Sequence, residues 1–492
     1  MNNVMNRSLA GAVGLLMAIV IAHVAWYAAH PYVIDTIGRT NMVAALELAA
    51  GRPIYMTPDT GGAISMGYTP GFPLLGALMF KVLGFSRWVW SGIWAGIDLI
   101  VLVAATFYLL KRAGWFALLV PAAMLGCLFP VVWARGDVAA VGLFWLAWVL
   151  LNPMPVSSAS MRDKGMMTLA LAAIAFALSA LFKQTMLPAS VLAAAIWVLE
   201  RSDTPLRRQI AFSVLFVTGI AGALGIMLVL YGAAYHENAA AMLQVITLGK
   251  THEVVPAAFA RYLALYAVAT ALPTAAALGQ VRSRYSVVLL HAIGLSFLLY
   301  AAKDGGSWHH LLALVLPWGL CATRTRKGTP YPMRDLWTVA PALLVCALGF
   351  ALIFRPGIAT KEDISAANSL AMVFETLRPS DGDVMVIDSD GVFAFPEAAY
   401  RHGFHTRWER GALEEWSAAT RSLPPRLLAD IEMRSFQRIV VRGSSGKLPS
   451  FSAYGVPYAS MNDAIGNAYV PCAILQVAGW TQYCRKQAAI QP

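Results

Sequence analysis

Charged side chains lie at the ends of apolar segments in this sequence, where they could act on a ligand. Asp35 follows the first apolar segment, Asp137 precedes another, and Lys183 ends a third. Ionisable groups at membrane depth cost free energy and usually serve a function. A carboxylate there can take a proton from a hydroxyl group or bind a divalent metal ion, whereas an ammonium or guanidinium group can hold a phosphate.

Further polar residues occur at comparable places, in three short runs that read ARGDVAAVG, ALFKQTMLP and KDGGSWHHLL. These runs contribute the candidate ligand-binding residues Arg135, Lys183, Gln184, Lys303, Asp304, His309 and His310. Together with the two aspartates, Asp35 and Asp137, they supply both the carboxylates and the cations that a phosphate-dependent transfer reaction requires.

Each candidate also has a structural interpretation, which the sequence leaves open. Asp35 could cap the helix that follows it, and Arg135 could form a local ion pair with Asp137. Lys183 could extend to the membrane interface to solvate its charge. The run 303–310 could be a surface turn followed by interfacial side chains.

Apolar segments must position these residues. The 492 residues are 58% hydrophobic and 13% charged, against about 25% charged in an average soluble protein. Runs near 20 apolar residues are long enough to cross the hydrocarbon layer as helices. We predict an all-α membrane domain over residues 1–355 with about eleven spans, near 8–29, 88–110, 115–133, 137–152, 166–182, 185–199, 209–231, 257–279, 285–302, 308–322 and 336–355.

One short apolar run and one acidic residue inside this predicted domain differ from the ordinary spans. The run 70–84 contains Pro70 and Pro73 and is short, so we predict an interfacial or re-entrant helix; if it crossed, every later segment would invert. Asp98 lies within an apolar span, and we expect it to be a buried, hydrogen-bonded group rather than a catalytic one.

Charge distribution predicts the orientation. Residues 1–355 hold 24 lysines and arginines against 12 acids, whereas residues 356–492 hold 13 against 14. With an inner N-terminus, fourteen of those 24 basic residues fall in short inner turns, as the positive-inside rule requires. The first loop, 30–87, and the C-terminal part then lie outside a cytoplasmic (inner) membrane. No basic patch carries interleaved exposed aromatic residues, so nucleic acid is not expected as a partner.

Residues 356–492 change pattern and predict a small extracytoplasmic α/β domain. DVMVID (383–388) and FQRIVV (436–441) are typical of short buried strands, and 367–377 and 413–423 of amphipathic helices. Cys472 and Cys484 could form a disulfide if this domain faces an oxidising compartment.

The first loop resembles the GT-C superfamily of membrane glycosyltransferases. The likeness is to the branch of protein O-mannosyltransferases and lipid A aminoarabinose transferases, in which an acidic residue follows the first helix and an aromatic–proline run comes later. The residues that fit this order are Asp35, Gly51, Pro53, Tyr55, Tyr68, Pro70 and Pro73. Many members have two adjacent acids at the first position, where this chain has Asp35 followed by Thr36.

This resemblance implies transfer of a sugar from a polyprenyl-phosphate donor lipid to an acceptor glycan, lipid or protein on the outer face. It implies Asp35 and Asp137 as catalytic residues, with Asp35 a general base or the ligand of a divalent metal such as Mg or Mn. Tyr55 and Tyr68 join the substrate-binding candidates, although both could be only an aromatic anchor at the interface. Alternatives are a transporter or flippase for a lipid-linked or anionic solute, and a ligase or polymerase acting on lipid-linked oligosaccharide. Transporters often show inverted repeats, which this sequence lacks.

Overall fold

The computed structural model describes the chain in segments, and the account below concerns these alone. They are residues 2–29, 36–51, 54–55, 69–113, 117–128, 136–151, 161–200, 205–248, 254–278, 284–302, 308–323, 384–387, 425–442, 452–453, 456–457, 459–475 and 480–486. The predicted span 336–355 and the predicted amphipathic helices 367–377 and 413–423 lie outside these residues.

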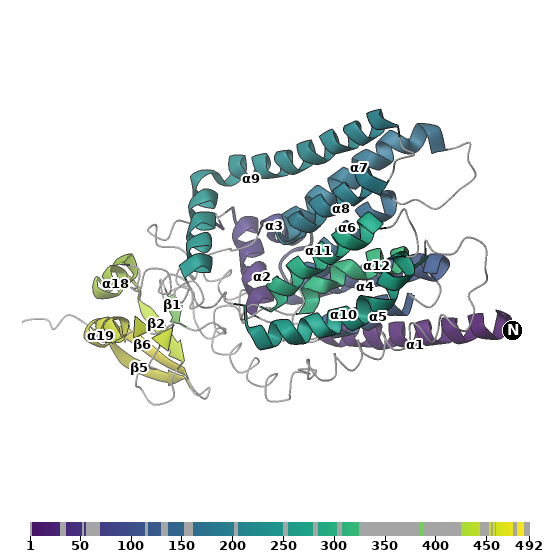
Figure 1. Ribbon diagram of the computed structural model, residues 1–492. Helices are drawn as coiled ribbons and strands as arrows, with labels where there is room; N and C mark the ends of the chain where they lie inside the picture. The colour runs from purple at the N-terminus through teal and green to yellow at the C-terminus, as the bar shows by residue number, and fades with distance from the viewer. Residues whose placement is uncertain are drawn as a thin grey trace, which may run out of the picture.

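Helices make up the first part of the molecule (Figure 1). They are α1 (Asn2–Ala28), α2 (Thr36–Ala49), α3 (Gly71–Leu83), α4 (Arg87–Ala113), α5 (Leu119–Leu128), α6 (Asp137–Leu151), α7 (Met161–Phe182), α8 (Met186–Glu200), α9 (Leu206–Leu248), α10 (Pro256–Leu278), α11 (Arg284–Ala301), the 3₁₀ helix η5 (Trp308–Leu314) and α12 (Val315–Thr323). One continuous apolar core joins them, with α6 packed between α4 and α7.

Four helices in the described part are long and apolar enough to cross a bilayer, which makes this a membrane protein. These stretches are Arg7–Trp26, Trp88–Lys111, Gly165–Phe182 and Leu206–Val229. Apolar side chains such as Ile100 and Val229, which are 68% and 85% exposed, cover their outer surfaces as lipid contact requires.

Other predicted spans differ in detail from the structure. Within the stretch predicted over 115–133, the described residues 117–128 contain the ten-residue α5. The stretch predicted over 308–322 is divided into η5 and α12. The proline-containing run after residue 69 forms α3, whose thirteen residues are about 20 Å long, less than the roughly 30 Å hydrocarbon layer. Helix α9 is interrupted at Gly232, whose φ of 53° breaks the helical path.

A mixed β-sheet lies beyond the end of the bundle that α1 reaches at Ala28, away from Asn2 (Figure 1). Its strand order is β1 (Val384–Ile387), β2 (Arg438–Arg442), β6 (Trp480–Arg485) and β5 (Tyr469–Leu475). Strands β1 and β2 are parallel, and the other neighbours are antiparallel. The two predicted strands correspond to β1 and β2.

Two helices cover this sheet, α18 (Pro425–Glu432) and α19 (Ala459–Ala468), and a small separate ribbon is formed by β3 (Ser452–Ala453) and β4 (Val456–Pro457). The sheet and the two helices share a core that is distinct from the core of the bundle. It includes Met385, Leu427, Ile431, Ile439, Met461, Ile465 and Tyr483.

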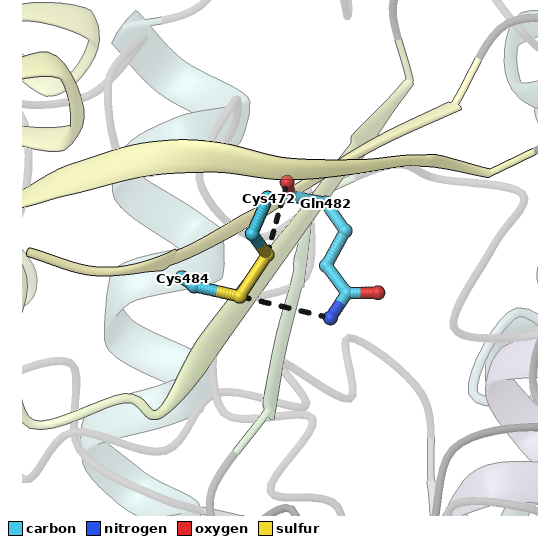
Figure 2. The surroundings of a disulfide bond; sticks show 3 residues. All are labelled: Cys472, Gln482 and Cys484. Atoms are coloured by element: carbon cyan, nitrogen blue, oxygen red, sulfur yellow. Dashed lines mark hydrogen bonds between the residues drawn. A yellow bond between two sulfur atoms is a disulfide. The ribbon is translucent and has the colours of Figure 1, made fainter.

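The predicted disulfide is present between Cys472 and Cys484, on neighbouring strands β5 and β6 (Figure 2). A register shift between Pro471 and Ala473 leaves Cys472 without a partner residue directly opposite it. The Cα atoms of the two cysteines are 5.6 Å apart, within the usual range for a bridge. Gln482 lies beside the bridge, its Nε2 4.0 Å from Cys484 Sγ.

Candidate functional site

A buried ion pair lies where the start of α6 meets the end of α7. Asp137 is the first residue of α6, and Lys183 follows the last residue of α7. Lys183 Nζ contacts Asp137 Oδ1, and the two residues are only 9% and 6% exposed. Buried charges in proteins are normally paired, because an isolated charge in a low-dielectric interior loses its solvation energy. Each residue therefore holds the other in its charged form at this position.

Neighbouring helices fix the position of the pair. Ser179 Oγ, one turn before Lys183, donates a hydrogen bond of 2.7 Å to the carbonyl oxygen of Ala140, one turn after Asp137. This bond ties the end of α7 to the start of α6. The carboxylate of Asp137 also lies in the first turn of its helix, where the helix dipole favours a negative charge.

Gly136 allows an aromatic side chain to approach the start of α6. Its φ is 77°, in the left-handed region that glycine adopts without strain. A Cβ atom at this position would overlap the ring of Phe72, from the first turn of α3. The Phe72 ring stacks on Trp94 of α4, with 3.8 Å between ring centroids. The Phe72 ring therefore covers the turn before Asp137, with Trp94 packed against that ring.

Gln184 anchors the aromatic–proline run to the same helix end. Its Oε1 accepts a hydrogen bond of 3.1 Å from the backbone N–H of Thr69, which lies within the YTPGF sequence. The approach is close, because a Cβ atom on Gly71 would lie 2.6 Å from the carbonyl oxygen of Leu181. Gln184 thus holds the segment that leads into α3, and its role in substrate binding stays a prediction.

An apolar groove of about 480 Å³ begins beside the ion pair. Its end nearest the pair is formed by Phe182, which precedes Lys183, and by Ala139, two residues after Asp137. Five helices line it, namely α3, α4, α6, α7 and α12, through Leu75, Ile97, Ile100, Val101, Ala104, Ala105, Tyr108, Ala139, Gly142, Leu143, Trp145, Leu146, Val149, Phe182 and Leu316. An apolar channel with charges at one end matches a ligand that has a hydrocarbon chain and an ionic head.

Several predicted site residues cannot be compared with the structure. Asp35, Arg135, Tyr68, Lys303 and Asp304 lie outside the described residues, as does the side chain of His309. Their grouping around the Asp137–Lys183 pair therefore remains a prediction.

Two other candidates are placed by the structure. Tyr55 is 2% exposed and packs edge-on against Tyr231 of α9, with 4.9 Å between ring centroids. His310 is half-buried in η5, near the rings of Phe297 and Tyr300. Helix η5 is joined to α6 by a 2.9 Å hydrogen bond from Trp145 Nε1 to the carbonyl oxygen of Ala313. His310 therefore belongs to an element that contacts α6, whereas Tyr55 has a packing role.

Asp98 corrects one expectation. It is buried in α4 at 5% exposure, as predicted, but within the described part of the chain its Oδ2 has no hydrogen-bond partner. Ser91 Oγ and Trp94 Nε1, on the same side of α4, are buried and lack partners among the described residues as well. The buried face of α4 thus carries polar atoms that its neighbouring helices leave unsatisfied.

The described residues were compared with the ligand sets that hold divalent metals. Among them, no group of three or more His, Cys, Asp or Glu side chains is gathered in metal-binding positions. Asp137 is already neutralised by Lys183, so it does not offer an open carboxylate. A metal bound by Asp35 stays a prediction, since that residue lies outside the described part.

Sequence comparison gave no identification: no family model matches the chain, and neither does any curated protein. Structure comparison found two kinds of neighbour, at low identity. The archaeal oligosaccharyltransferase AglB of Archaeoglobus fulgidus, in complex with an inhibitory peptide and a dolichol-phosphate, has 11% identity and a TM-score of 0.43, over 87% of this chain and 69% of that one.

The second neighbour is the arabinofuranosyltransferase AftD from Mycobacteria, with 14% identity and a TM-score of 0.47. The match covers 98% of this chain but only 40% of AftD, so this chain spans well under half of that protein's length.

Proposed function

We propose that this chain transfers a sugar from a polyprenyl-phosphate donor to an acceptor hydroxyl group at the outer face of a cytoplasmic membrane. One observation carries the proposal: residues next to a buried charged pair in the chain, Ala139 and Phe182, line a long apolar groove. A lipid-linked sugar has the same two parts, a hydrocarbon chain and a phosphate next to the sugar. The resemblance of the first loop to the GT-C superfamily supports the same reading.

In this proposal Lys183 donates to the donor phosphate while it stays paired with Asp137. The acceptor oxygen attacks the anomeric carbon from the side opposite the phosphate, so that configuration inverts. The bond between that carbon and the phosphate oxygen breaks, and the phosphate leaves with the electron pair. A fixed cation stabilises this growing negative charge, as preorganised electrostatic groups do in enzymes. Arg135 and Lys303 are proposed as further cations of this clamp.

Asp35 is the proposed base. The acceptor hydroxyl must lose its proton as the new bond forms, and Asp137 is held by Lys183. Asp35 follows α1 at the end of the bundle where α2 begins, and its carboxylate would accept this proton directly or orient the reactants through a divalent ion. Placement of this end of the bundle outside the membrane rests on the distribution of basic residues.

Substitution of Asp35 tests the proposal. Asp35→Asn keeps the shape of the side chain and removes its charge, so transfer should fall at least about a hundredfold with folding unchanged. The assay uses full-length protein in lipid nanodiscs with a set of polyprenyl-phosphate sugars and scores sugar transfer. Asp463→Asn is the matched control, because Asp463 is exposed on α19, outside the helical bundle.

Two results would decide against the assignment. Near-normal transfer by the Asp35→Asn protein would exclude Asp35 as the base, and a wild-type protein that moves no sugar from any donor in the set would exclude the transferase itself. A chelator separates the two roles of Asp35: it abolishes activity if the carboxylate binds a metal, and leaves a pH-dependent activity if the carboxylate is the base.

A further inference from the structure

Cationic side chains gather at the end of the sheet where β2 begins and β6 ends. Arg434 lies shortly before β2, Arg485 is the last residue of β6, and Lys486 follows it. Arg434 Nη1 donates a hydrogen bond of 2.8 Å to the carbonyl oxygen of Lys486. Arg485 donates bonds of 2.8 and 2.9 Å to the carbonyl oxygens of Phe436 and Ser435. Each guanidinium group is therefore fixed on the backbone next to the other arginine.

A buried tyrosine shows that the two guanidinium charges act at one place. The Tyr469 hydroxyl donates a hydrogen bond of 2.9 Å to the carbonyl oxygen of Phe436, which also accepts from Arg485 Nε. Burial raises the pKa of Tyr469, and the charges of Arg485 and Arg434 oppose that rise. Both positive charges are thus close enough to act on the same hydroxyl group.

Lys486 adds a third cation at the same end of the sheet. Its Nζ donates a hydrogen bond of 2.8 Å to the carbonyl oxygen of Gly466, near the end of α19. Arg434 and Lys486 are partly buried, and Arg485 is exposed, so water-soluble ligands can reach the group. We call Arg434, Arg485 and Lys486 the cationic cluster.

The charge of the cationic cluster is not compensated by the part of the chain that the structure describes. The hydrogen bonds above all go to backbone carbonyls, and no carboxylate among the described residues forms an ion pair with the cluster. Carbonyl oxygens hold the cations in place without neutralising them. Like charges held close together repel one another, and a bound anion relieves that repulsion. A guanidinium group also has more N–H donors than these bonds use, so donors remain for a ligand.

Arg434 occupies a backbone position that normally belongs to glycine. Helix α18 ends with hydrogen bonds from the N–H of Ser435 to the carbonyl of Asp430 and from the N–H of Arg434 to the carbonyl of Ile431. This is the pattern in which the residue after the helix is left-handed and usually glycine. Arg434 has a φ of 58° there, at a cost in backbone energy. Strained backbone persists where a side chain is needed, and here the side chain belongs to the cationic cluster.

The cationic cluster lies on the side of the sheet that is remote from the helical bundle. Arg434 follows the end of α18, and Lys486 is bonded to α19. Figure 1 shows both helices on the side of the sheet away from the bundle. Because the bundle is the part that enters the membrane, the cluster faces water rather than lipid headgroups. A ligand of the cluster is therefore an anion carried by a water-soluble molecule.

We infer that the cationic cluster binds a carboxylate or phosphate group on a soluble acceptor saccharide. This inference rests on the proposed function, which requires an acceptor with a free hydroxyl group. Carboxylate and phosphate groups match guanidinium groups in geometry, because two oxygens can accept two parallel N–H bonds. The C-terminal part then selects acidic acceptors, and the helical bundle carries out the transfer.

Binding of soluble saccharides to the full chain in phosphatidylcholine nanodiscs tests the inference. The acidic probes are tetragalacturonate and maltotetraose that bears a phosphate, and the neutral probe is maltotetraose. We expect at least one acidic saccharide to bind about tenfold or more tighter than the neutral one. Raising NaCl from about 50 to about 300 mM should weaken that binding at least about threefold, because salt screens exposed charges. Flotation with phosphatidylglycerol vesicles measures binding to an anionic lipid surface.

Substitutions in the cationic cluster locate the site. Arg434→Gly removes a cation and places glycine at a left-handed position, so the end of α18 should stay formed. Arg485→Gln and Lys486→Gln remove the other charges and keep N–H donors for the carbonyls. Each change should weaken binding of the acidic saccharide at least about threefold, and the triple variant should lose the preference over maltotetraose. Arg207→Gln is the matched control, because Arg207 is exposed at the start of α9, in the bundle.

Hydrogen exchange of β2 and β6 checks that the sheet is intact in each variant. If the triple variant loses the sheet, the single Arg434→Gly variant decides, because glycine suits that backbone position. Acidic and neutral saccharides that bind wild type equally, or cluster variants that bind like the Arg207→Gln protein, would overturn the inference and leave the transferase proposal standing. Binding of phosphatidylglycerol vesicles without binding of either acidic saccharide would also overturn it. A wild-type protein that prefers acidic saccharides but transfers no sugar from any donor would exclude the acceptor role together with the proposed function.

Discussion

The Asp137–Lys183 pair illustrates how one interaction can combine structural and functional roles. Both residues are buried, so loss of either partner leaves the other charge without compensation, at a cost of about 3–5 kcal/mol. A single substitution would thus reduce activity even if the pair did nothing beyond holding α6 to α7. Separation of the two roles requires removal of both charges together.

We predict that Asp137→Leu combined with Lys183→Met recovers much of the stability that each single change loses, and yet fails to transfer sugar. Apolar replacements of similar volume often match or exceed a buried ion pair in stability, because no charge has to be desolvated. Thermal unfolding in detergent, followed beside the transfer assay, measures both quantities. Recovery of activity in the double variant would mean that Lys183 does not contact the donor.

Sequence reasoning located this pair only in part. The predicted spans alternate in direction, and this places residues 137 and 183 on the same side of the membrane. An ion pair between Asp137 and its near neighbour Arg135 was as compatible with the sequence as the observed pair with Lys183. Which cation faces Asp137 depends on the packing of α6 against α7, and that packing is set by contacts such as Ser179 with Ala140, far apart in the chain.

Helix α3 is short, and three contacts with α6 and the end of α7 hold it beside the site. Thr69 bonds to Gln184, Gly71 packs on the backbone of Leu181, and Phe72 covers Gly136. Together they fix the outer wall of the groove, to which Leu75 belongs. Weakening these contacts should therefore alter ligand binding while the Asp137–Lys183 pair stays intact.

We predict that Gln184→Met weakens binding of an isoprenyl phosphate about threefold to tenfold, because the Thr69 N–H loses its acceptor, an effect of roughly 1 kcal/mol for a typical hydrogen bond. Gln184→Glu keeps an acceptor oxygen at the same reach and serves as the control. Equal binding by the two variants would indicate that this hydrogen bond does not position α3.

For the helices, hydropathy indicated where apolar segments lie but not whether each segment forms one continuous helix. The short length of α3 was predicted from the prolines and the length of its apolar run. The division of the stretch after residue 308 into η5 and α12 could not be predicted, since η5 is shaped by tertiary contacts such as the Trp145–Ala313 hydrogen bond. The groove was missed for the same reason, because its walls come from five separate helices.

The molecule as a whole divides into a positively charged bundle and a nearly neutral C-terminal part. The sheet of the C-terminal part contains a disulfide. The bridge links β5 to β6 and closes a short loop, with a sequence separation of 12. Disulfides persist in oxidising compartments, so the bridge is consistent with the proposed outer location of this part.

We predict that Cys472→Ser together with Cys484→Ser lowers the stability of the sheet by about 2–3 kcal/mol, because the unfolded loop gains conformational freedom. Hydrogen exchange of β5 and β6 in the full chain, compared with wild type, measures this loss. The bundle provides the internal control, since exchange in α6 and α7 should not change. Free thiols at both positions in protein from native membranes would contradict the bridge and weaken the case for an outer location.

The order of strands in this sheet has a consequence for biosynthesis. Strand β6 lies between β2 and β5. During synthesis, β2 can therefore pair with β1 on one side only. Its other edge stays open until residues 480–485 have left the ribosome and reached the same compartment. An exposed strand edge invites pairing with other chains and attack by proteases. During that interval the emerging polypeptide depends on chaperones for protection, and a premature stop codon just before residue 480 would leave a product that quality control removes, although every helix of the bundle had already been made.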